Sequence, residues 1–300
     1  MTQQLAIVST IEKFTWNWKG HKIVYTVMGS GRPLVLLHGF GASIGHWRQN
    51  IPVLANGGYR VFALDLLGFG ASEKPAIDYS LDLWVELLKD FFDTHIQEPA
   101  IFIGNSIGGL LSLMVVANHP EIAAGAVLIN CAGGLNHRPD ELNLPLRLVM
   151  GSFTKLVSSK VFGPFLFDRI RQKHRIRRTL QQVYFNRDAI ADELVEMLYE
   201  PSCDTGAQHV FASILTAPPG PSPSDLLPKV THPILVLWGD KDPWTPIAGA
   251  TIYQQFQQMG KPIQFIPIPN AGHCPHDEKP EVVNQLILDW LREENSVVRS

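Results

Sequence analysis

Two short stretches of this chain carry the pattern Gly-x-Ser-x-Gly, which often surrounds a serine that acts as a nucleophile. One is GNSIG, with Ser106 at its centre, and the other is GASIG, with Ser43 at its centre. With this content of glycine and serine, the pattern arises by chance roughly once in ten chains of this length. The residues around each serine must therefore decide between them.

Ser106 lies between a short apolar run, AIFIG, and a long apolar segment that begins GGLLSLMVVA. This order predicts a strand, a sharp turn and a helix, the arrangement that lifts a serine hydroxyl off a sheet. Ser43 follows the loop HGFGA, and no strand runs directly into it. We therefore predict Ser106 as the nucleophile and Ser43 as the N-cap of a helix in IGHWRQNIPVLA.

A serine nucleophile needs a base, and the stretch NAGHCPHDEKP offers His273 and His276. His273 follows a glycine in a loop after the last predicted strand, where its ring can reach Ser106, so we predict it as the base. His276 precedes an acidic stretch and is predicted to be a solvated or capping residue. The remaining candidates are predicted to lie on the surface or in turns: His119, His174 and His232.

The base in turn needs an acid that orients it. The stretch WGDKDPWTP follows another predicted strand and contains Asp240 and Asp242. Asp242 lies far enough beyond the strand to reach the histidine, and it is the predicted acid. Asp240 is better placed to cap the turn.

Attack on an acyl carbon creates an oxyanion, which needs preorganised N–H donors. We predict the backbone N–H of Ile107, directly after the nucleophile, as one donor and that of Phe40 in the HGF loop as the other. His38 in the same loop is interpreted as a side chain that braces the loop.

These residues require a sheet to position them, and the hydrophobic pattern predicts eight strands. FTWNW and KIVYTVM alternate around a turn and predict a hairpin, whereas LVLLH is apolar throughout and predicts a strand buried on both faces. Helical segments follow most of the later strands, and Ser80 is a predicted N-cap. Alternating strands and helices indicate an α/β fold with a mostly parallel sheet and helices on both faces. The other predicted strands are 59–64, AIFIG, 126–130, 234–238 and 263–268.

The alternation stops after the sixth predicted strand and resumes only at ILVLW. We interpret residues 133–225 as a helical cap inserted into one α/β core, which comprises residues 1–132 and 226–300. The proline-rich stretch APPGPSPSD leads back into the core.

Composition excludes several other classes of protein. The net charge of −3 gives no sign of nucleic-acid binding, and no residue spacing indicates a metal or cofactor site. Three scattered cysteines, Cys131, Cys203 and Cys274, are interpreted as reduced thiols. The first residues show no secretory leader. We expect a protein that is cytoplasmic or peripheral to an intracellular membrane.

Taken in order, HGFGAS, DLLGFGASEKP, GNSIGGL, WGDKDPWTP and AGHCPHDEKPE resemble the α/β-hydrolase superfamily across nearly the whole core. In that family the nucleophile, acid and base follow each other as Ser106, Asp242 and His273 do here. The resemblance implies that Asp65, in DLLGFG, is structural. In the dehalogenase and epoxide hydrolase branches the nucleophile is an aspartate, so Ser106 argues against both.

Three motifs, GNSIGG, LLGFGASEKP and LWGDKDPWTPI, look like those of the pheophytinase and chlorophyll dephytylase group. That group hydrolyses the phytyl ester of chlorophyll-type pigments. The same set is similar to serine hydrolases that split carbon–carbon bonds in aromatic ring-fission products. The resemblance therefore implies hydrolysis of a lipophilic carboxylic ester, with carbon–carbon bond hydrolysis as an alternative. A third possibility is a slow-turnover ligand-binding receptor that keeps the same three residues.

The predicted cap combines an apolar and a basic segment. LPLRLVMGSFTKLVSSKVFGPFLF would suit a long hydrocarbon chain. DRIRQKHRIRR follows, with six cations in residues 169–178. Such a run is usually a solvated helix face; the alternative is a basic surface that contacts anionic lipid or an acidic substrate.

Overall fold

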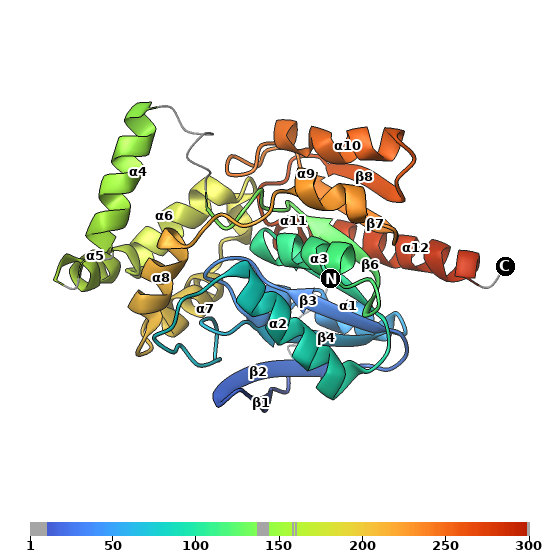
Figure 1. The fold of residues 1–300 in the computed structure, drawn as a ribbon, viewed down its shortest axis with the longest axis horizontal. Helices are drawn as coiled ribbons and strands as arrows, with labels where there is room; N and C mark the ends of the chain where they lie inside the picture. Colours follow the sequence, from blue (N-terminus) through green and yellow to red (C-terminus); the bar gives the residue numbers. More distant parts are fainter. Residues whose placement is uncertain (1–10, 137–143, 158, 160, 299–300) are drawn as a thin grey trace.

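The computed structural model describes residues 11–136, 144–157, 159 and 161–298 (Figure 1). Its centre is one eight-stranded sheet in the order β1-β2-β4-β3-β5-β6-β7-β8. The β1–β2 and β2–β4 pairs are antiparallel, and all later neighbours are parallel. The predicted α/β fold with a mostly parallel sheet is therefore confirmed. The strands are β1 Phe14–Trp18, β2 His21–Met28, β3 Pro33–Leu37, β4 Arg60–Asp65, β5 Ala100–Asn105, β6 Ala123–Ile129, β7 Ile234–Gly239 and β8 Ile263–Ile268.

The predicted hairpin is formed by β1 and β2. Trp16 lies opposite Ile23, so the apolar side chains of the two strands share one face. Lys19 and Gly20 make the turn, and both have positive φ, as two-residue hairpin turns of the primed type require.

The central strands are buried on both faces. In β3, Val35 and Leu37 belong to one apolar cluster, whereas Leu34 and Leu36 belong to the cluster on the opposite face. An unbroken apolar run is therefore what this position in a sheet requires.

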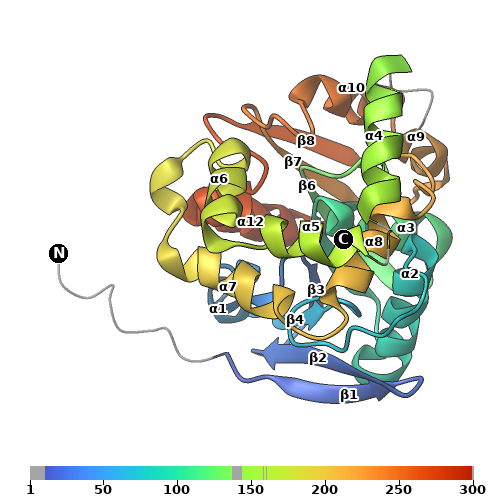
Figure 2. The ribbon, with the colours of Figure 1, turned by 90° about the vertical axis from the view of Figure 1, so that its left-hand side faces the viewer.

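Helices cover both faces of the sheet (Figures 1 and 2). Ser80 caps α2 as predicted, because its side chain accepts a hydrogen bond from the N–H of Leu83. The apolar residues of α2, α3 and α10 pack in the first cluster, and those of α1 and α12 pack in the second. These helices are α1 Ile51–Asn56, α2 Leu81–Phe91, α3 Ile107–Asn118, α10 Thr251–Gln258 and α12 Pro280–Val298.

Between β6 and β7 the described residues contain helices and no strand. These helices, α4 to α9, are called the helical insert below; Figure 1 shows α4 to α8 at one end of the sheet and α9 beside α3 of the core. The side chains of residues 144–150, part of the apolar segment of the predicted cap, lie outside the described residues. The helices are α4 Leu144–Val157, α5 Phe162–Ile170, α6 Lys173–Val183, α7 Asp192–Ser202, α8 Ala207–Thr216 and α9 Pro223–Leu226.

Three further sequence expectations concern a secretory leader, membrane contact and the cysteines. Residues 1–10, where no secretory leader is predicted, lie outside the described residues. Within the described ranges, no helix combines the length and apolarity that a bilayer crossing requires. The three cysteines are free thiols.

Candidate active site

Ser106 occupies a strained turn between β5 and α3. Its φ of 56° and ψ of −117° are values that residues with a side chain rarely adopt. The turn is tight enough to demand glycine on both sides. A Cβ on Gly104 would lie 2.0 Å from the carbonyl oxygen of Gly108, and one on Gly108 would lie 2.1 Å from that of Leu37. The glycines of the motif therefore hold Ser106 at the point where the strand meets the helix.

Asp242 and His273 form a buried pair beyond the ends of β7 and β8. The Nδ1 atom of His273 lies 2.6 Å from Oδ2 of Asp242. The other oxygen, Oδ1, accepts the N–H groups of Trp244 at 2.7 Å and Thr245 at 3.1 Å. The carboxylate can only accept hydrogen bonds, so its contact fixes the proton of His273 on Nδ1 and leaves Nε2 as an acceptor.

Further contacts keep Asp242 ionised. Burial alone would raise the pKa of its carboxyl, but hydrogen bonds from His273 and Thr245 outweigh burial and lower the pKa below its usual value. Asn130 donates to Oδ2 at 2.7 Å. Asn105, directly before Ser106, donates to the carbonyl oxygen of His273 at 2.9 Å. Side chains from the ends of β5 and β6 thus position the pair.

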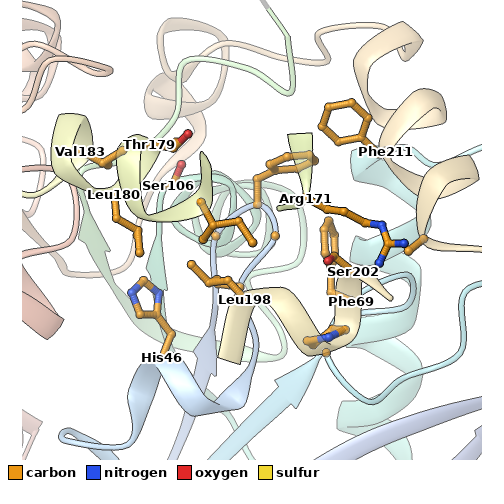
Figure 3. A pocket seen from close by; sticks show the side chains of 18 of the residues that line it. His46, Phe69, Ser106, Arg171, Thr179, Leu180, Val183, Leu198, Ser202 and Phe211 are labelled. Atoms are coloured by element: carbon orange, nitrogen blue, oxygen red, sulfur yellow. The ribbon is translucent and has the colours of Figure 1, made fainter. Parts of the chain in front are cut away.

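Ser106 and His273 line one cavity of about 360 Å³. In the described residues no hydrogen bond joins them, and such bonds often form only when substrate is bound. The cavity lies between the ends of the strands and the helical insert. Most of its wall is apolar, and Figure 3 shows Leu180, Leu198 and Phe211 of the insert around it together with Ser106.

The two predicted oxyanion donors lie at the same cavity. Phe40 lines it, and Ile107 is the first residue of α3, where backbone N–H groups have no partner within the helix. In the part of the chain that the structure describes, neither N–H donates to a protein acceptor. Both amides are therefore free to bind an anion, and the helix N-terminus favours negative charge there.

Ser43 is the residue before a short 3₁₀ helix, Ile44–Trp47, as its predicted place at a helix start requires. Ser43 is thus the N-cap residue, as predicted, but its side chain makes no capping hydrogen bond. The buried carboxylate of Asp65 replaces it and accepts the N–H of Ile44 at 2.6 Å. Asp65 also accepts the N–H of Ala71 at 2.8 Å, in keeping with a structural role.

His38 braces its loop, as predicted. It is fully buried, its Nδ1 lies 2.8 Å from the carbonyl oxygen of Gly39, and its Nε2 accepts the N–H of Leu66 at 3.1 Å. Asp240 fixes a turn, because it accepts the N–H of Asn270 at 2.7 Å. Neither side chain reaches the Asp242–His273 pair through a described hydrogen bond.

The prediction that His276 is solvated or capping is wrong. His276 is 0% exposed and packs on Trp47, with 4.3 Å between the ring centroids. The residues after His273 form a helical turn, α11 Pro275–Glu278, whose inner side faces the core. Burial lowers the pKa of His276 well below its usual value, so the ring is neutral.

No pattern in the sequence singles out His46, yet it lines the cavity from beneath (Figure 3). Its Nε2 lies 2.8 Å from the hydroxyl of Tyr184, which donates to Asp277 at 2.8 Å. Arg48 also contacts Asp277, with 2.7 Å between nitrogen and oxygen. These contacts join the core to the insert. The sequence separation of 138 residues between His46 and Tyr184 explains why spacing alone cannot reveal them.

His46 predicts a pH dependence of stability. Burial lowers its pKa to about 4, whereas the unfolded chain takes up the proton near pH 6.5. The unfolded state thus binds more protons between these values, and stability is lost as the pH falls through them. We expect a loss of about 3 kcal/mol in the free energy of unfolding from this group.

Denaturant unfolding of the wild type and of His46→Gln at pH 7, 5.5 and 4.5 measures this effect. Glutamine keeps a donor for Tyr184 but does not titrate, so the variant should lose less stability on acidification. Equal losses in the two proteins would contradict the assignment.

The loop that carries His273 is bound directly to the insert. The N–H of His273 donates to the carbonyl oxygen of Val183 at 2.9 Å. The buried carboxylate of Glu278 accepts the N–H of Gly272 and, from the insert, that of Phe185, each at 2.9 Å. Movement of the insert at this point would therefore move the histidine.

Comparison with known proteins agrees with this fold. The family model described as "Alpha/beta hydrolase family" matches residues 34–286. A carbazole-degradation serine hydrolase, the CarC enzyme, superposes with a TM-score of 0.74 at 24% identity, over 94% of this chain and 98% of its own. The fold is therefore shared over almost the whole length of both proteins.

Two relatives of known activity differ in the bonds they cleave. The chain is 30% identical to the chloroplastic pheophytinase of Arabidopsis thaliana. The match covers 87% of this chain but only 61% of that protein. It is 28% identical to the 2-hydroxy-6-oxo-6-(2'-aminophenyl)hexa-2,4-dienoic acid hydrolase of Metapseudomonas resinovorans, over 97% of this chain and 94% of that one. With the match to the family model over most of its length, the chain belongs to the alpha/beta hydrolase family.

Proposed function

We propose that this protein is a serine hydrolase that cleaves a lipophilic carboxylic ester through an acyl-enzyme. The observation that carries the proposal is one cavity, largely apolar, that contains both Ser106 on its strained turn and His273 held by Asp242. The similarity to pheophytinase supports a substrate that is an ester of a long-chain alcohol. The specific candidate is the phytyl ester of a chlorophyll-type pigment.

In the proposed reaction, Oγ of Ser106 attacks the ester carbonyl while Nε2 of His273 takes the hydroxyl proton. Asp242 stabilises the imidazolium that forms, and the N–H groups of Phe40 and Ile107 bind the oxyanion. His273 then gives its proton to the leaving alcohol. A water molecule, activated by the same ring, attacks the acyl-enzyme and releases the carboxylic acid and free Ser106.

The helical insert, in this proposal, is the cap that selects the substrate, with residues 133–225 as the cap and the rest as the core. Its helices supply apolar walls through Phe167, Leu180 and Val210. Two cations at the cavity have anionic partners: Lys74 contacts Asp204 and Arg171 contacts Asp168. A hydrocarbon chain therefore meets a mostly apolar surface with little uncompensated charge.

A screen of p-nitrophenyl esters graded by chain length, with pheophytin and chlorophyll included, tests the proposal. We expect steady multiple turnover, with kcat/KM rising from short to long chains because more apolar surface is buried. A single acylation event without turnover would instead indicate a receptor. A preference for the shortest esters would contradict the lipophilic substrate.

Carbon–carbon bond hydrolysis is the second candidate, and Arg171 is the observation that favours it. Its guanidinium lies at the cavity wall, 2.7 Å from Asp168, and can also attract a carboxylate. The Metapseudomonas relative acts on such an acid. Side-by-side assays of a ring-fission product and a long-chain ester separate the candidates. An Arg171→Gln variant should raise KM for the acid alone if this second reaction is the native one.

A further inference from the structure

Helix α5 lies at the wall of the cavity, and its two faces differ in what they contact. Phe167 and Ile170 line the cavity. Phe162 and Phe165, on the other side, are 59% and 62% exposed. One helix therefore presents apolar side chains both to the proposed substrate site and to the surroundings.

Exposed apolar side chains also lie at the end of α4, which packs against α5, and together they are called the α4–α5 patch below. Val161 is 76% exposed and Leu156 is 43% exposed, so four large apolar side chains within ten residues face outward. Figures 1 and 2 show α4 and α5 at the outer edge of the insert, away from the sheet. Single exposed apolar residues are ordinary on a soluble protein, but a group of this kind marks an interaction surface.

The same patch carries positive charge. The guanidinium of Arg169 lies 5.1 Å from the ring centroid of Phe165, and Lys155 is exposed beside Leu156. In the described residues neither cation has an ion-pair partner. Aromatic side chains with adjacent cations suit the boundary between lipid headgroups and acyl chains.

The basic run that follows contributes less charge than its composition implies. Three of its six cations are paired with carboxylates of the insert: Arg171 with Asp168, Lys173 with Glu196 and Arg177 with Asp192. Glu196 and Asp192 belong to α7, so this part of the run forms ion pairs between α6 and α7. The surface that best suits membrane contact is therefore on α5 and not along the whole basic run of residues 169–178.

We propose that this α4–α5 patch, formed by Leu156, Val161, Phe162 and Phe165 with the cations Lys155 and Arg169, docks on an anionic lipid membrane. The inference rests on the proposed function, because the patch would be the surface beside which a lipophilic ester enters the cavity. With the patch in the headgroup region, the opposite face of α5 places the cavity next to the bilayer. A substrate then passes from lipid to cavity with little exposure to water, which lowers the cost of transferring it.

Vesicle flotation of the Ser106→Ala protein tests docking without any turnover. We expect it to float with phosphatidylcholine vesicles that contain phosphatidylglycerol at low salt, and far less with pure phosphatidylcholine. Salt near the molar range should release much of the bound protein, because it screens Lys155 and Arg169. Failure to float with the anionic vesicles at low salt would overturn the proposal.

A matched pair of variants locates the surface. The double variant Phe162→Ser and Phe165→Ser should lose about tenfold or more in vesicle partitioning, since two apolar anchors are removed. Met259→Ser, at an exposed methionine after α10 of the core, should partition like the unaltered protein. Equal partitioning of the double variant and the control would contradict the assignment.

A soluble substrate separates this inference from the proposed function. With Ser106 intact, the double variant should hydrolyse a short p-nitrophenyl ester at the wild-type rate, because neither phenylalanine lines the cavity. It should lose activity only on a long-chain ester presented in vesicles. Loss of vesicle binding with soluble turnover intact supports docking, whereas loss of soluble turnover in the double variant would overturn the separation of patch and site.

Discussion

Replacement of Ser106 by alanine is expected to lower kcat/KM for ester hydrolysis by about four orders of magnitude or more. The reason is that the variant keeps the cavity, the free N–H groups and the Asp242–His273 pair but has no atom that can form the acyl-enzyme. The residual rate would come from a bound water molecule. Because alanine removes only one oxygen, thermal unfolding should show a folded protein. Progress curves with a p-nitrophenyl ester measure the effect.

Ser43→Ala is the matched control for this variant. Ser43 is the centre of the other Gly-x-Ser-x-Gly stretch, yet its side chain is buried and makes no capping bond. We expect activity within a few-fold of the wild type. A Ser106→Ala protein that keeps its activity, with activity lost in Ser43→Ala, would reverse the assignment of the nucleophile.

Replacement of Asp242 by asparagine is expected to lower kcat by about four orders of magnitude. Both oxygens of Asp242 are acceptors: Oδ1 for the N–H groups of Trp244 and Thr245, Oδ2 for Asn130 and His273. An asparagine must place an NH₂ group against one set of donors. If it faces His273, the proton moves to Nε2 and the ring can no longer accept from the nucleophile. The neutral amide also cannot stabilise an imidazolium.

Asp240→Asn controls for a general effect of losing a carboxylate in this loop. Asp240 is two residues away and accepts only the N–H of Asn270 among the described hydrogen bonds of its side chain. We expect its kcat to stay within a few-fold of the wild type. A larger loss in Asp240→Asn than in Asp242→Asn would refute the choice of the acid.

The core of the fold could be predicted from the sequence because each of its elements is indicated by neighbouring residues. The alternation in FTWNW, the unbroken apolar run LVLLH and the cap at Ser80 each follow from the chemistry of neighbouring residues. Each signal gave the correct element, although bounds differ by a few residues. The sixth strand, for example, begins at Ala123, three residues before the predicted start.

The differences from prediction arose where a residue's environment comes from distant parts of the chain. His276 stands beside acidic residues in sequence, but its ring packs on Trp47, more than two hundred residues away. Ser43 has a side chain suited to capping, but Asp65 reaches the same helix start from the end of β4. Local chemistry cannot reveal such competition, because only the assembled sheet brings these groups together.

The side chains that position the predicted catalytic pair also could not be predicted from sequence patterns. Asn130 and Asn105 contact Asp242 and His273 only because parallel strands end at the same edge of the sheet. The basic run of the insert is a similar case, since its pairing with α7 depends on how two helices pack. The catalytic roles of Ser106, Asp242 and His273 stay predictions, to which the geometry adds the positioning groups.

Peptide mapping of the intact protein after reaction with a fluorophosphonate determines whether Ser106 is the nucleophile. The reagent phosphonylates an activated serine, and mass spectrometry identifies the modified peptide. One adduct per chain, on the peptide that contains Ser106, with much slower labelling in Asp242→Asn, is the predicted result. An unlabelled Ser106, or an adduct on Ser43 instead, would show that Ser106 is not the nucleophile.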